Sequence, residues 1–157
     1  MGRLFPLLLL AASFAVIGGA LLFQYLGGLQ PCELCLYQRW PYFAVMALCS
    51  LALIAGPRAT RGAVALAAIL FLAGAVVAFY HVGVEQHWFA GPASCTAPAL
   101  NAGSVADLRA QLLGTPPVRC DEVQWSLFGI SMAGWNLVAS LALAAVAAIG
   151  AARRERP

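Results

Sequence analysis

Four long apolar stretches, separated by short polar segments, dominate the pattern along the chain. Residues 4–30, 40–57, 62–84 and 123–152 contain no Asp, Glu, Lys or Arg. A helix that crosses a membrane needs about 20 predominantly apolar residues. The pattern therefore predicts an all-α integral membrane protein, a four-helix transmembrane bundle with helices at about 6–28, 38–56, 62–81 and 125–150. The first stretch is longer than the core of a signal peptide, so we expect it to remain as a helix.

These helices leave two loops on the same side of the membrane, and we expect residues 1–157 to form a single membrane domain. The loop at about 29–37 is short, and the loop at about 82–124 is long and polar. Within the long loop, Ser104 and Asp107 have the spacing of a helix capping box, and Val105, Leu108 and Leu112 share one helical face. We expect a short amphipathic helix there, either an ordinary loop helix or one lying in the membrane surface.

Composition and charge exclude several classes of protein. Hydrophobic residues make up 62% of the 157 residues and charged residues only 10%, too apolar for a soluble domain of this size or for a disordered chain. The nine basic residues are all arginines without a stripe along one face, so we expect no nucleic-acid partner. By the positive-inside rule, the larger arginine set marks the cytoplasmic side, where both termini then lie. The larger set is Arg3, Arg58, Arg61, Arg153, Arg154 and Arg156, and the smaller set is Arg39, Arg109 and Arg119.

The cysteines fall into an outer group of four and one membrane-embedded residue. Cys32 and Cys35 form a C-x-x-C pair in the short loop, Cys95 and Cys120 lie in the long loop, and Cys49 lies deep in the second helix. We expect Cys49 to be an inert core residue. Three readings of the outer cysteines are open: a redox-active pair, a zinc site, or two structural disulfides. Because the long-loop cysteines are 25 residues apart and do not form a ligand pair, we expect no metal. A disulfide between these two cysteines would stabilise the loop.

Position favours the redox interpretation. Cys35 lies at the outer membrane edge where a helix begins, and a helix N-terminus favours a thiolate. Arg39 follows by four residues on the same helical face. An arginine there either anchors lipid headgroups or stabilises a thiolate and a carbonyl oxygen that gains negative charge. A dithiol gives up two electrons and a quinone accepts two, so a lipid-soluble quinone fits this edge.

Four motifs resemble the DsbB family of bacterial disulfide bond formation proteins. They are PCELCLYQR at 31–39, GPASC at 91–95, CDEVQW at 120–125 and FGISM at 128–132. The resemblance extends over nearly the whole chain. It implies an inner-membrane thiol:quinone oxidoreductase that reoxidises a periplasmic thioredoxin-like dithiol oxidase (DsbA-like) and reduces ubiquinone or menaquinone. The rival class is a non-catalytic four-helix membrane scaffold whose outer loop is stapled by disulfides.

The resemblance also implies roles for single residues. The partner's thiolate would attack Cys95, and Cys120 would leave. Cys120 or the released loop dithiol would exchange with Cys32, which leaves Cys35 as the thiolate facing the quinone. Arg39 would hold the quinone and stabilise charge on it.

Two further positions at the quinone follow from the same resemblance. The family has a quinone-proximal histidine at the outer end of the third helix, where His81 and His87 both lie. We prefer His87, which lies nearer the turn, although its spacing to Cys95 leaves the choice open. Met132 matches a family methionine near the quinone, and its alternative role is packing of the fourth helix.

Overall fold

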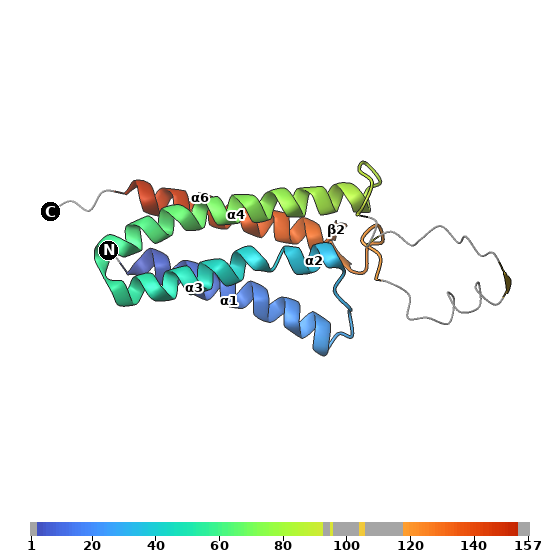
Figure 1. Ribbon diagram of the computed structural model, residues 1–157, viewed down its shortest axis with the longest axis horizontal. Helices are drawn as coiled ribbons and strands as arrows, with labels where there is room; N and C mark the ends of the chain where they lie inside the picture. The colour runs from blue at the N-terminus through green and yellow to red at the C-terminus, as the bar shows by residue number, and fades with distance from the viewer. Residues whose placement is uncertain (1–2, 93–94, 96–103, 106–117, 154–157) are drawn as a thin grey trace.

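The computed structural model describes residues 3–92, 95, 104–105 and 118–153. Its helices are α1 (Leu4–Tyr25), α2 (Glu33–Tyr37), α3 (Trp40–Ala55), α4 (Pro57–Glu85) and α6 (Met132–Ala152) (Figure 1). With α2 and α3 joined as one segment, four helical segments among the described residues are long and apolar enough to cross a membrane. Large apolar side chains on their outer surfaces are exposed, as contact with lipid requires. The predicted four-helix membrane fold is confirmed.

The helix ends differ from the expected ones for local reasons. α4 begins at Pro57, directly after Gly56 with φ 104°, and continues to Glu85. The sequence pattern predicts this helix at 62–81, because charged residues bound the uncharged stretch on both sides. A helix can nevertheless extend past the apolar region into water, and proline is well suited to its first turn. The short loop also contains α2, so helical structure begins before position 38, where the second membrane helix was expected to start.

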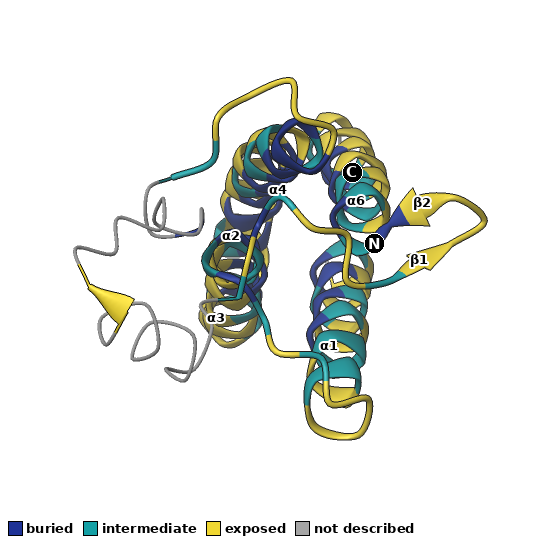
Figure 2. Ribbon diagram, turned by 90° about the vertical axis from the view of Figure 1, so that its right-hand side faces the viewer, coloured by how far each residue is buried: buried dark blue, intermediate teal, exposed yellow. Residues whose placement is uncertain are grey.

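The last helix starts later than position 125 because a β-hairpin precedes it. Strands β1 (Ser126–Leu127) and β2 (Ile130–Ser131) pair antiparallel around Phe128 and Gly129, which both have positive φ. α6 then begins with Ser131 as its N-cap, whose hydroxyl accepts from the amide of Gly134 at 3.1 Å. Figure 2, which looks along the bundle, shows this hairpin projecting from its side.

Small residues allow the helices to pack closely. α4 makes its most extensive contacts with α6 and α3, whereas α1 packs mainly on α3 and touches α6 only briefly. A Cβ atom at Gly74 would lie 3.2 Å from the ring of Pro41 and 3.6 Å from Ser140 Oγ, so glycine permits the approach of three helices there. Cys49 is buried in the apolar core of the bundle, as the sequence predicted.

The two ends of the bundle differ in chemistry. The start of α1, the α3–α4 turn and the end of α6 lie together at one end, with Arg3, Arg58, Arg61 and Arg153 (Figure 1). The opposite end carries α2, the hairpin and the cysteines of both loops. The amphipathic helix expected after Ser104 lies largely outside the described residues.

Candidate active site

The C-x-x-C pair forms the first turn of the second membrane segment. Cys32 caps α2, and its Sγ accepts from the backbone amide of Cys35 at 3.3 Å. The two sulfur atoms are 3.0 Å apart and both are free thiols. Cys32 is 2% exposed, and Cys35 is partly exposed. The pair is therefore placed to share one proton, or to form a disulfide after a small movement.

Cys32 is the sulfur of this pair that ionises first. The hydrogen bond with Cys35 and the contact with His81 lower the pKa of Cys32 from 9.0 to about 5, although burial opposes both effects. A second thiolate 3.0 Å away would meet strong repulsion from the first. In the dithiol, Cys35 therefore acts as the thiol that donates to Cys32.

The second cysteine pair is joined and lies against the first. Cys95 and Cys120 form a disulfide, and both are buried. They share an apolar cluster with Cys32, Leu34 and Val84, the last from the outer part of α4. This packing brings the long loop onto the start of α2, so that all four outer cysteines gather at one place.

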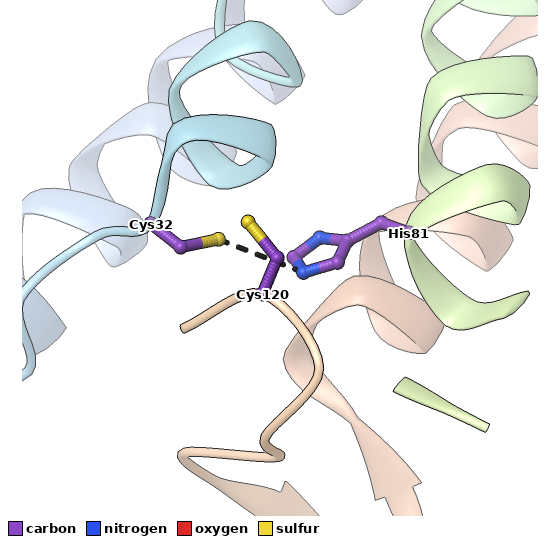
Figure 3. A group of neighbouring side chains, drawn as sticks. All are labelled: Cys32, His81 and Cys120. Atoms are coloured by element: carbon purple, nitrogen blue, oxygen red, sulfur yellow. Dashed lines mark hydrogen bonds between the residues drawn. The ribbon is translucent and has the colours of Figure 1, made fainter. Parts of the chain in front are cut away.

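One histidine joins this cluster. Nε2 of His81 lies 3.6 Å from Sγ of Cys32, and these two atoms and Sγ of Cys120 all lie within 4.8 Å of one another (Figure 3). Soft donors this close form a possible metal-binding group, but Cys120 is engaged in a disulfide and offers no thiolate. The arrangement suits exchange between sulfur atoms better than metal binding. His87, the histidine preferred from sequence, is exposed in the turn after α4 and has a φ of 60°.

A cavity opens beside Cys35, where α1 and α6 make little contact. Its volume is about 440 Å³, and its walls come from α1, the α2–α3 segment, residues 125–127 and the start of α6. The walls are mostly apolar, and Phe23 and Trp125 have ring centroids 4.8 Å apart. Met132 also lines the cavity.

The polar part of the cavity wall is narrow and includes Arg39. Its guanidinium donates to Oε1 of Gln24 on α1 at 2.7 Å, so the charged group is held between two membrane segments. Cys35, Gln38 and Asn136 line the same cavity. A thiol and a fixed cation thus face one apolar chamber, whose size is typical of small-molecule sites.

Sequence reasoning did not assign roles to Gln38, Asn136 or Gln24. Each lies in or beside an otherwise apolar stretch, and polar side chains within membrane segments are usually functional. That rule would have identified all three, although it would not have shown that they meet at the cysteines.

Comparison with known proteins agrees with this geometry. Residues 2–150 match the family model described as "Disulfide bond formation protein DsbB". A protein named "Disulfide bond formation protein B" from Cupriavidus metallidurans is 32% identical, with 98% of this chain and 95% of that protein aligned. Its namesake from Aromatoleum aromaticum is also 32% identical, over 94% and 90% of the two chains. "Disulfide bond formation protein B 2" from Pseudomonas syringae pv. syringae is 34% identical, over 85% and 78%. No solved structure matches.

The family match covers nearly the whole chain, and the two cysteine pairs meet at one end of a four-helix membrane bundle. This protein belongs to the DsbB family of membrane disulfide bond formation proteins, which places it among the disulfide-forming oxidoreductases.

Proposed function

We propose that the protein is a thiol:quinone oxidoreductase. It oxidises a periplasmic thioredoxin-like dithiol (DsbA-like) to the disulfide and passes the two electrons and two protons to ubiquinone or menaquinone. The observation that carries this proposal is the apolar cavity of about 440 Å³ that meets Cys35 and Arg39. A scaffold held together by disulfides needs neither a free C-x-x-C pair nor a cation at such a chamber.

The residues around the cavity fit a quinone. Such a molecule, when bound, supplies a two-electron acceptor. The apolar walls from α1 and α6 would hold a hydrophobic ring, Arg39 would bind a carbonyl oxygen and favour negative charge there, and Met132 would pack on the ring. We assign the family's histidine to His81 rather than His87, because His81 contacts Cys32 and His87 is exposed.

The cluster of sulfur atoms supports a chain of thiol exchanges. A partner thiolate attacks Cys95, forms a mixed disulfide and releases Cys120 as a thiolate. Cys120 then attacks Cys32 of the oxidised C-x-x-C pair, so that a Cys32–Cys120 bond forms and Cys35 leaves as a thiolate. The partner's second thiol attacks the mixed disulfide, which completes the partner's disulfide and frees Cys95.

Cys95 closes the cycle within the loop. It attacks Cys120, restores the loop disulfide and releases Cys32. The C-x-x-C pair then holds the two electrons that came from the partner. Loss of two electrons to the acceptor restores the Cys32–Cys35 disulfide.

The charge distribution supports the bacterial inner membrane with both termini in the cytoplasm. Arg3, Arg58, Arg61 and Arg153 lie at the end of the bundle opposite the cysteines. Positively charged residues near membrane spans favour the cytoplasmic side. The cysteines then face the periplasm, where disulfides persist.

The test is turnover by the purified protein with quinone and a reduced thioredoxin-like oxidase. Loss of quinone absorbance should accompany oxidation of the partner, and Cys35→Ser should abolish it, whereas Cys49→Ala should retain it. Arg39→His should raise the apparent KM for quinone because the carbonyl contact is weakened. If the wild-type protein does not reduce quinone, or if Cys35→Ser turns over normally, the proposed electron route is wrong and the scaffold alternative gains support.

A further inference from the structure

A line of hydrogen-bonded polar side chains crosses the bundle interior next to the cysteines. Asn136 on α6 donates its side-chain N–H to Oε1 of Gln38. Nε2 of Gln38 lies 2.6 Å from Nδ1 of His81 on α4. Behind Asn136, the hydroxyl of Tyr42 donates to Oδ1 of Asn136 at 2.7 Å and lies 2.8 Å from Ser140 Oγ. Three membrane segments thus contribute to one polar line that ends at His81.

The hydrogen bonds in this line run in one direction. Because Oε1 of Gln38 accepts from Asn136, the amide group that faces His81 is Nε2, which can only donate. Nδ1 of His81 must therefore accept, and the single proton of the neutral ring lies on Nε2. That Nε2 is the atom 3.6 Å from Sγ of Cys32.

We infer that Gln38, held in place by Asn136, is a positioning residue that fixes His81 in the Nε2–H tautomer, so that the imidazole donates a hydrogen bond to Cys32 instead of taking its proton. The competing arrangement reverses every bond in the line: Gln38 then turns its oxygen to His81, and Nε2 accepts from a neutral thiol. Between these two neutral forms, a thiolate at Cys32 favours the first, because a negatively charged sulfur needs a donor. A doubly protonated ring would need an acceptor at Nδ1, where the Asn136 hydrogen bond places Nε2 of Gln38.

The surroundings of Cys32 show why this donor matters. Among the described residues, the other ionisable groups that interact electrostatically with Cys32 are Cys35 on α2 and Glu85 on α4. Glu85 accepts from the hydroxyl of Ser131 and carries negative charge when ionised, which opposes a thiolate nearby. Cys120 lies in a disulfide. Cys35 and His81 are therefore the side-chain donors that offset the burial of Cys32.

The inference rests on the proposed function only where it says what the tautomer is for, which is to keep Cys32 able to leave as a thiolate during exchange with Cys120. The test of the tautomer needs neither quinone nor partner, so the inference and the proposed function can fail separately. The chain has only two histidines, so ¹⁵N-histidine labelling gives two imidazole signal sets, and His87→Gln identifies the set of His81. The ¹⁵N shifts of a neutral ring distinguish a protonated Nε2 from a protonated Nδ1.

In the reduced wild-type protein, the spectrum should show His81 protonated on Nε2 and unprotonated on Nδ1. Gln38→Met removes the donor at nearly unchanged length, so the Nδ1–H tautomer should appear beside the Nε2–H tautomer that the Cys32 thiolate still favours. Gln38→Glu presents only acceptors to the ring and should place a proton on Nδ1. A wild-type ring protonated on Nδ1 would overturn the inference, and this measurement needs no variant at the site to fold.

A second readout separates positioning from simple packing. The midpoint of Cys32 ionisation, followed by ultraviolet absorbance of the thiolate against pH, should rise by about one pH unit in Gln38→Met, as expected when a donor to a charged group is weakened. An unchanged tautomer together with an unchanged midpoint in Gln38→Met would also overturn the inference.

Discussion

The ionisation of Cys32 offers the most direct test of the site's electrostatics. Cys35 makes the largest contribution to lowering the pKa of Cys32 to about 5. Cys35→Ala removes the donor, whereas Cys35→Ser keeps a hydroxyl in nearly the same place. Both variants lack the second thiol of the C-x-x-C pair. They differ in whether residue 35 can still donate a hydrogen bond to Cys32.

The expected magnitude follows from the strength of one hydrogen bond to a charged group. Such bonds contribute about 1.5–3 kcal/mol, and one pKa unit corresponds to about 1.4 kcal/mol. The pKa of Cys32 should thus rise by about one to two units in Cys35→Ala. It should stay close to the wild-type value in Cys35→Ser, because the serine hydroxyl still donates and His81 still contributes.

The assay must measure a midpoint and not a rate at one pH. Ultraviolet absorbance of the thiolate, taken as the difference from the matched Cys32→Ser protein over about pH 4 to pH 9, gives the midpoint without a reagent having to reach the buried sulfur. A single-pH rate is misleading because each unit rise in thiol pKa makes the thiolate about threefold more nucleophilic, which partly cancels the smaller ionised fraction. If the wild-type midpoint lies near the ordinary value of 9.0, or if the alanine and serine variants share one midpoint, the reasoning is refuted.

Three further predictions concern redox chemistry and packing. Because the pKa of Cys32 lies near 5, reduction at neutral pH should take up one proton for two electrons. The potential of the C-x-x-C pair should then fall by about 30 mV per pH unit between about pH 6 and pH 8, and a slope of about 59 mV in equilibration with a dithiol buffer would contradict this. Gly74→Leu should lower the Tm in detergent, because the new side chain would meet Pro41 and Ser140. Overpacking of this kind costs about 1–3 kcal/mol. An unchanged Tm would contradict close packing of the three helices at this position. Ser131→Ala should cost at least about 0.5–2 kcal/mol of stability, because it removes both the cap of α6 and the hydrogen bond to Glu85. Ser131→Thr keeps the hydroxyl and should lose less, and equal losses would contradict the role of the hydroxyl.

The sequence was sufficient to predict the membrane fold because lipid imposes a simple rule. A long uncharged stretch must be helical in a bilayer, so four such stretches predict four helices. The ends of the helices were less predictable because they lie at the polar membrane surface, where a helix can contain charged residues. Arg58 and Arg61 belong to α4, and the stretch before Met132 folds as a hairpin although it is as uncharged as the helix that follows.

The sulfur chemistry was partly visible in the sequence, since the C-x-x-C spacing sets two thiols one helical turn apart whatever surrounds them. The choice between His81 and His87 could not be made from spacing along the chain. Both lie near the outer end of α4, and the face and height at which α2 packs on α4 decide which ring reaches Cys32. That packing depends on contacts among Leu34, Val84 and the loop disulfide, which no spacing along the chain reveals.

The cavity was the least predictable feature, because it arises where contacts are weak. α1 packs on α3 and touches α6 only briefly, so a chamber remains between them and Cys35 and Arg39 face it. Neither helix has a sequence pattern that distinguishes a lipid-facing side from a ligand-facing one, since both are apolar. The polar residues at the chamber, Arg39, Gln24 and Asn136, are the distinguishing signal, because in lipid each would be costly without a partner. An apolar chamber with a few polar groups beside the thiol would suit the quinone that we propose, because its ring would lie next to Cys35 and Arg39.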